Sequence, residues 1–215
     1  YFCRADLLPG HAFTDDARGS TAASFLKSPA SARLSALGFG AAALRSPDAF
    51  FYNPAGAAYL PEGSGAILLG YESLLEDSGR GAVAGLKGLG RGVLGLGALY
   101  RYDAGMKKYD IYGDAAGSFE AHDEAFAGYY GARLGRTDAG VSVKYVRSRL
   151  ANRSADAVAM DLGVLIKEKA GDGMALAFFA RNLGSSMKLG SESAPLPLEF
   201  GGGLNWRYVP RFNLF

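Results

Sequence analysis

The stretch that decides the fold, residues 19–60, reads GSTAASFLKSPASARLSALGFGAAALRSPDAFFYNPAGAAYL. It is rich in small residues and carries few charges, and Pro29 and Pro47 interrupt its weak helical patterning. Small side chains allow a segment to fold compactly in a confined space. We therefore predict that residues 19–60 form a plug and that residues 61–215 form the wall around it. Residues 1–18 show no periodicity and predict a flexible lead-in.

The plug ends in Asn53, Pro54, Ala55 and Gly56, which we interpret as a hatch corner. Proline fixes its own φ angle and lacks a backbone donor, and an asparagine side chain readily hydrogen-bonds the nearby backbone. A rigid corner at this point would direct residues 20–52 back into the lumen of the wall.

After Gly63 the apolar residues recur at every second position, which indicates β-strands with two distinct faces. One face is apolar, and the other carries glycines and isolated charges. Residues 105–123 are the least regular part and predict a hairpin with a longer loop, and residues 149–156 predict a second polar loop. The clearest predicted strands are 65–73, 93–102, 125–135, 139–149, 157–167, 174–181 and 196–207.

Two all-β architectures produce this alternation. In an antiparallel transmembrane β-barrel the apolar face meets lipid, whereas in a soluble sandwich it forms the core. Three features favour the barrel. The strands reach about ten residues, against a mean of about 5–6 in soluble proteins. Several connections are short, and aromatic residues such as Tyr100, Tyr145 and Trp206 lie near strand ends, where membrane interfaces favour them. The alternation alone does not decide between the two architectures. Extraction would, because a soluble sandwich needs no detergent.

The composition narrows the classes of function. The 215 residues carry a net charge of +2, which does not suggest a nucleic-acid partner, and the single cysteine excludes an internal disulfide framework. The two histidines, His11 and His122, fall in predicted loops, and no catalytic triad or metal-ligand spacing accompanies them. We therefore expect no enzyme activity, no metal and no cofactor.

The sequence also predicts a fragment of a larger barrel. It begins at Tyr1 rather than at methionine, and Val209–Phe215 reads as a strand that has only begun. No apolar run approaches the ~20 residues of a membrane-spanning helix, whereas a spanning strand needs only about 9–11 residues.

Seven charged residues lie on strands whose other face is apolar, so we predict that they face the lumen. Charges away from bulk water are normally paired, which favours a buried ion-pair network; the alternative is contact with a substrate. These lumen-facing candidates are Arg133, Lys144, Asp161, Lys167, Arg181, Glu199 and Arg207.

Several motifs occur in an order that resembles one known family. In the plug they are Phe25-Leu26-Lys27, Ala32-Arg33, Ala36-Leu37-Gly38 and Tyr52-Asn53-Pro54-Ala55-Gly56, and in the wall they are Val143–Arg149, Met160–Gly163, Arg181–Gly184 and Leu196–Phe200. Over residues 19–208 the chain is similar to the PorV/PorQ-type outer-membrane proteins, which are relatives of the FadL long-chain fatty acid transporters. Ala57 departs from the pattern, because the family usually has leucine at this position.

The resemblance implies a FadL-like barrel, truncated here, with an N-terminal hatch in its lumen. It implies a location in the outer membrane of a Gram-negative-type bacterium and passage of small hydrophobic molecules. The expected partners are then outer-membrane lipid and a hydrophobic ligand. The PorV-type branch implies an alternative function, as an accessory of type IX protein secretion that binds other secretion-system proteins.

Overall fold

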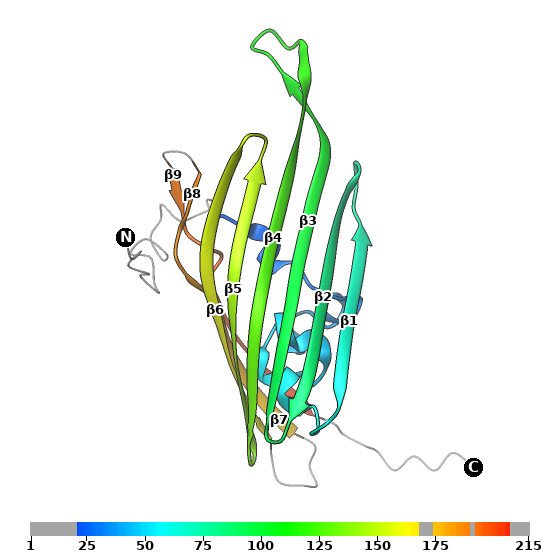
Figure 1. Cartoon of the computed structure of the whole chain (residues 1–215), viewed down its shortest axis with the longest axis vertical. Coiled ribbons are helices and arrows are strands. Elements are labelled where there is room, and N and C mark those ends of the chain that lie inside the picture. The colour runs from blue at the N-terminus through cyan, green and yellow to red at the C-terminus, as the bar shows by residue number, and fades with distance from the viewer. Residues whose placement is uncertain (1–20, 168–173, 190–191, 207–215) are drawn as a thin grey trace, which may run out of the picture.

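The computed structural model describes residues 21–167, 174–189 and 192–206, so the predicted lead-in 1–18 and Arg207 lie outside the described residues. The described chain is an antiparallel β structure, which confirms the all-β class. Eight strands form one sheet in the order β1-β2-β3-β4-β5-β6-β7-β10, curled into a half-barrel (Figure 1). These strands are β1 (Gly65–Ser73), β2 (Ser78–Leu89), β3 (Gly92–Tyr109), β4 (Ala115–Leu134), β5 (Thr137–Leu150), β6 (Arg153–Lys167), β7 (Met174–Gly184) and β10 (Glu199–Trp206). A small hairpin of β8 (Met187–Leu189) and β9 (Glu192–Ala194) forms a separate two-stranded sheet, and β8 contacts β6.

The seven strands predicted from alternation all occur in the sheet, whereas β2 was not predicted. Its inward positions are taken by Ala82, Ala84 and Leu86, which are buried. Its outward positions include Gly85 and Lys87 rather than a row of large apolar residues. Because both faces of β2 mix small and apolar side chains, the polarity does not alternate along the strand.

Two predicted loops are shorter than expected. The hairpin expected within residues 105–123 exists, but the longer loop is wrong, because β3 continues to Tyr109 and β4 begins at Ala115. Beyond Asp103 and Ala121 these two strands pair only with each other and project past their neighbours (Figure 1). The polar loop expected at residues 149–156 is also wrong, because β5 and β6 leave only a two-residue turn between them.

In this sheet the large apolar side chains lie on the exposed face, whereas in the sheet of a soluble protein they lie on the buried face. On the convex face Ile67 and Leu69 are each 77% exposed, and Leu96 is 75% exposed. The concave face is built mainly from small, buried side chains, which include Ala82, Ala84, Ala125, Ala127, Ala155, Ala157 and Ala159. Among the described residues, the apolar face is therefore not the core of a sandwich.

Residues 21–60 form short helices inside the curve of the sheet (Figure 1). Helix η4 contacts β1 and β2, η5 contacts β3 to β6, and η3 contacts β7 and β10. Only the concave side of a curled sheet gives one segment access to both of its edges. The helices are η2 (Ser24–Lys27), α1 (Ala32–Leu37), η3 (Gly38–Ala43), η4 (Pro47–Phe51) and η5 (Pro54–Tyr59). None of the described helices is long and apolar enough to cross a membrane.

The helices are short for reasons that the sequence supplies. Pro47 and Pro54 stand at the first positions of η4 and η5, where a missing backbone donor does no harm. The Ser31 hydroxyl accepts a hydrogen bond from the Leu34 amide at 3.2 Å and caps α1, which ends at Gly38 with φ at +51°. This N-terminal segment (residues 21–60) is therefore a chain of single turns that follows the concave face.

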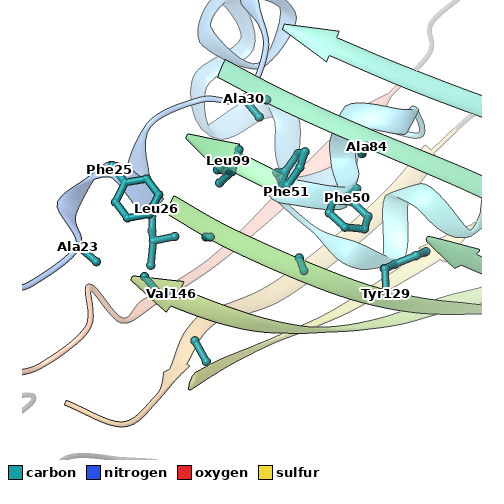
Figure 2. Packing of buried hydrophobic residues seen from close by; sticks show 14 of the residues in the cluster. Ala23, Phe25, Leu26, Ala30, Phe50, Phe51, Ala84, Leu99, Tyr129 and Val146 are labelled. Carbon is teal, nitrogen blue, oxygen red and sulfur yellow. The ribbon is translucent and has the colours of Figure 1, made fainter. Parts of the chain in front are cut away.

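Large side chains on the N-terminal segment fit against small residues on the sheet. Phe50 is 1% exposed, and its ring centroid lies 4.5 Å from that of Phe51 and 5.3 Å from that of Tyr129 (Figure 2). A Cβ atom built on Gly97 of β3 would come within 2.7 Å of the Phe50 ring. The core therefore lies between the segment and the sheet, and it depends on a wall of small residues.

Candidate functional site

The predicted hatch corner, Asn53 to Gly56, is buried along its whole length. Asn53 is 0% exposed, its Nδ2 donates to the Ala42 carbonyl at 2.7 Å, and its Oδ1 accepts from the Ala55 amide at 3.1 Å. The Tyr129 hydroxyl of β4 donates to the Pro54 carbonyl at 2.8 Å. The asparagine thus holds the corner together from within, and the tyrosine joins it to the sheet.

The corner rests on a pair of glycines that sequence analysis did not identify. Gly140 of β5 and Gly163 of β6 are register partners. A Cβ on Gly140 would lie 2.4 Å from the Pro54 carbonyl carbon, and one on Gly163 would lie 2.0 Å from Asn53 Oδ1. Real Cβ atoms do not come so close, so only glycine lets the corner backbone touch the strands. We call this pair the glycine seat.

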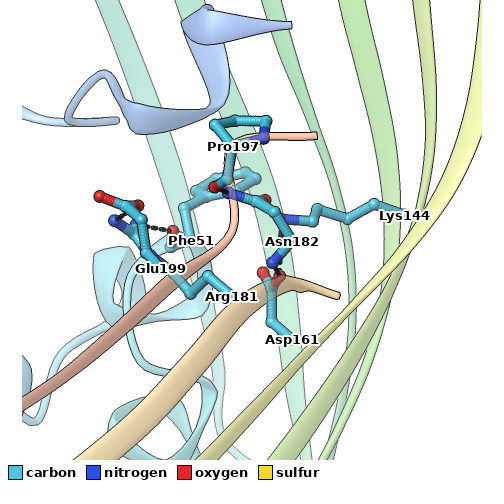
Figure 3. Close-up of polar contacts among 7 residues, drawn as sticks. All are labelled: Phe51, Lys144, Asp161, Arg181, Asn182, Pro197 and Glu199. Carbon is cyan, nitrogen blue, oxygen red and sulfur yellow. Dashed lines mark hydrogen bonds and ion pairs between the residues drawn. The ribbon is translucent and has the colours of Figure 1, made fainter. Parts of the chain in front are cut away.

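Lys144 and Asp161, two of the predicted lumen-facing residues, form a buried ion pair on the concave face (Figure 3). Their charged atoms are 2.7 Å apart, and the side chains are 6% and 2% exposed. Asn182 completes the group, because its Oδ1 accepts from Lys144 and its backbone amide donates to Asp161 at 2.8 Å. Its Nδ2 also donates to the Pro197 carbonyl at 2.9 Å, which ties the chain before β10 to the group.

Arg181 joins the sheet to the N-terminal segment. One end of its guanidinium pairs with Glu199, and the other donates to the Phe51 carbonyl at 3.2 Å (Figure 3). The same group lies 4.5 Å from the centroid of the Tyr52 ring, which adds a cation–π contact. Burial raises the pKa of the Tyr52 hydroxyl, with the Arg181 charge acting in the opposite direction, so the ring remains neutral.

The remaining predicted residues have different partners. Lys167 pairs at 2.6 Å with Asp138, a fully buried carboxylate that also lies 3.5 Å from Arg45 of the N-terminal segment. Arg133 donates to the Gly90 carbonyl in the β2–β3 turn. The structure thus unites Lys144 with Asp161 and Arg181 with Glu199.

Sequence analysis missed Asp138, Asn182 and Arg45 as partners in these contacts. Asp138 is the second residue of β5, whereas the predicted strand began only at residue 139. Asn182 has φ at +61°, at a point where the pairing of β6 with β7 shifts register, and no sequence pattern marks such a shift. The glycine seat left a signal, since Gly140 and Gly163 both occupy inward positions of their strands.

A cavity of about 720 Å³ lies between the N-terminal segment and β1 to β3. Its lining is mostly apolar or small, and its charged members are paired: Arg80 Nε donates to Glu72 at 2.8 Å, and Arg101 lies 3.1 Å from Asp103. The lining includes Phe25, Pro29, Ala30, Ala36, Ala82 and Leu99. The volume falls within the usual range of small-molecule pockets.

The described residues offer no group of three His, Cys, Asp or Glu side chains that could hold a metal ion. No known protein family matches the chain by its sequence pattern, and no curated protein matches it either. The candidate site is therefore defined by its geometry: a segment fastened to the concave face, and a cavity beside it.

We predict that Asp161→Asn destabilises the protein by about 3–5 kcal/mol, because it leaves the Lys144 cation buried without its counter-charge. The matched variant is Lys144→Met combined with Asp161→Asn, which removes the cation while an amide oxygen still accepts from Asn182. It should recover more than half of the loss in the free energy of unfolding, measured with urea. Equal losses in both variants would show that the pair does not act as an ion pair.

We also predict that Gly163→Val opens the glycine seat, because the new side chain would overlap Asn53. The free energy of unfolding should fall by about 1–3 kcal/mol or more, and proteases should cut residues 21–60 faster. Gly128→Val is the control, since a Cβ at Gly128 has no atom within 4 Å. Proteolysis that rises equally in both variants would contradict this account of the corner.

Proposed function

We propose that this chain forms part of the wall, and the plug, of a FadL-like outer-membrane β-barrel through which small hydrophobic molecules pass. One observation carries the proposal: the large apolar side chains lie exposed on the convex face, while the concave face packs on the N-terminal segment. A contiguous apolar surface of this kind marks an interaction site, and a face that extends over all eight strands suits lipid.

The backbone and the aromatic side chains support the same proposal. In lipid every backbone polar group needs an internal partner, and in the described sheet each strand from β2 to β7 is paired on both sides, while β1 and β10 are its two edges. Tyr71, Tyr100 and Tyr145 lie towards one end of the exposed convex face. Their hydroxyls bond to polar side chains: Tyr71 to Tyr102, Tyr100 to His122 and Tyr145 to Asp156. Rings with an apolar body and a hydrogen-bonded tip suit the boundary between hydrocarbon and headgroups.

The cavity suits a ligand of mainly apolar character. Phe25 and Leu99 line it from the N-terminal segment and from β3, and the nearby arginines already have acidic partners. In the proposed function a molecule would occupy this cavity and pass when residues 25–36 move away from β1 to β3. The Asn53–Gly56 corner would remain on the glycine seat.

A second candidate function, as an accessory of type IX secretion that binds other proteins, is supported by the projecting β3–β4 hairpin. Ile111 and Tyr112 at its tip are 91% and 83% exposed. Asp110 Oδ1 accepts from the amides of Tyr112 and Asp114, at 2.8 and 3.0 Å, which gives the tip a defined shape. Exposed, preorganised aromatic residues are typical anchors of protein interfaces.

We predict that Leu96→Arg on the convex face impairs membrane assembly at a cost of about 2–4 kcal/mol, because it places a charge in the hydrocarbon region. Ser118→Arg on the projecting hairpin adds the same charge outside that region and should assemble normally. The measurement is recovery in the outer-membrane fraction with heat-modifiable gel mobility. Recovery of the unaltered protein in soluble form without detergent would overturn the barrel proposal.

A cavity-filling variant separates the two candidate functions. Leu99→Trp places a larger side chain in the cavity and should lower uptake of a hydrophobic fluorescent probe in reconstituted vesicles. Leu94→Trp, on the convex face, is the control and should leave uptake unchanged. If Leu99→Trp has no effect but Ile111→Ser with Tyr112→Ser abolishes secretion of cargo proteins, the interaction function is correct instead.

A further inference from the structure

A row of five cations lines the end of the sheet where the β2–β3 and β4–β5 turns lie, at the bottom of Figure 1. Backbone and side-chain bonds join its members: the Arg133 amide donates to the Arg91 carbonyl at 2.8 Å, and Arg136 Nε donates to the Lys167 carbonyl at 3.2 Å. Lys87 Nζ donates to the Gly63 carbonyl at 2.7 Å. We call Lys87, Arg91, Arg133, Arg136 and Lys167 the basic rim.

Among the residues that the structure describes, the basic rim has few acidic neighbours. The residues at this end (61–65, 87–93, 132–138 and 165–167) hold five Lys and Arg against two carboxylates, Glu62 and Asp138, a formal net charge of +3. Asp138 is fully buried, and Lys167 and Arg45 already pair with it. Most bonds of the rim cations go to backbone carbonyls, which leave their positive charge uncompensated.

The opposite end of the sheet has the reverse charge. Residues 71–80, 101–124 and 147–156 hold seven Lys and Arg against ten carboxylates, a formal net charge of −3. The described sheet thus carries a charge difference along the direction in which it would cross a bilayer. A surface rich in anionic lipid would attract one end and repel the other.

Exposed apolar residues lie directly beside the basic rim. Leu89 is 51% exposed, Leu134 is 63% exposed and Ile166 is 43% exposed, each within two residues of a rim cation. Lysine and arginine can lay their alkyl stems along such a surface and keep the charged group at the headgroup level. Guanidinium groups bind phosphate oxygens through paired hydrogen bonds. The pattern therefore suits a molecule with an apolar body and a phosphate head.

We propose that the basic rim binds the phosphate headgroups of anionic phospholipids in the leaflet at this end of the barrel. This interaction fixes which end of the barrel meets that leaflet. It rests on the proposed membrane location, which supplies the lipid. A soluble polyanion fits less well, since its recognition would not need the apolar row beside the rim.

The test uses the purified protein reconstituted in vesicles, with phosphatidylglycerol as the anionic lipid and phosphatidylcholine as the zwitterionic one. The readouts are heat-modifiable mobility, for insertion, and native mass spectrometry of the lipid retained, for binding. Arg91→Gln with Arg136→Gln removes two exposed rim charges. Lys107→Gln with Arg149→Gln removes two charges at the opposite end and is the matched control.

The unaltered protein should prefer phosphatidylglycerol, and this preference should weaken as salt is raised. Loss of each rim cation should lower the preference for phosphatidylglycerol about fivefold, and loss of both should lower it about 30-fold. The control variant should keep the preference of the unaltered protein. Failure to insert into any vesicle would overturn the membrane proposal and this one with it. Normal insertion with equal retention of both lipids, or equal loss in the control variant, would overturn the lipid proposal alone. The lipid proposal would also be wrong if the unaltered protein bound heparin tightly in the absence of lipid and the rim variant lost that binding.

Discussion

The structure depends on the close approach of the Asn53–Ala55 backbone to strands β5 and β6. Two facing glycines leave the main chain of the sheet bare at this point, so the corner touches it directly. From this contact the N-terminal segment extends towards both edges of the sheet. Without it, the small residues of the concave face would have no core to join, because the large apolar residues lie on the other face.

This arrangement also explains why charged residues lie on the concave face. Because alanines and glycines are small, space remains between the concave face and the N-terminal segment. Ion pairs and amide side chains of the sheet occupy part of this space. Arg181 and Asp138 each hold one partner on the sheet and one on the segment. Among the described candidates, Lys144, Asp161, Lys167, Arg181 and Glu199 therefore take part in ion pairs, whereas Arg133 donates to a backbone carbonyl. Arg181 also donates to the backbone of the segment at the Phe51 carbonyl.

The fold was more predictable from the sequence than the site was. Alternation gave seven strands because their outward residues are large and apolar and their inward residues are not. It missed β2, where glycine and lysine occupy outward positions, and it overestimated two loops whose polar residues belong to paired strands. The Asn53–Gly56 corner was visible because proline and asparagine act on neighbouring residues. The alternation placed Gly140 and Gly163 on the inward face, but it did not reveal that they face each other, because that pairing depends on strand register.

The N-terminal segment is held unevenly, and this bears on how a plug of this form would move. At the corner, Asn53 and Ala55 are 0% exposed and rest on bare backbone. At the other end, the Arg33 side chain is 60% exposed and Leu37 is 45% exposed, and residues 25–36 line the cavity beside β1 to β3, although Phe25, Leu26 and Leu34 are buried. Displacing the corner would break buried hydrogen bonds and leave the glycine seat empty, whereas displacing residues 25–36 would expose Phe25, Leu26 and Leu34 and enlarge a space that already exists. Under the proposed function, the path therefore opens on the cavity side while the corner serves as the fixed point.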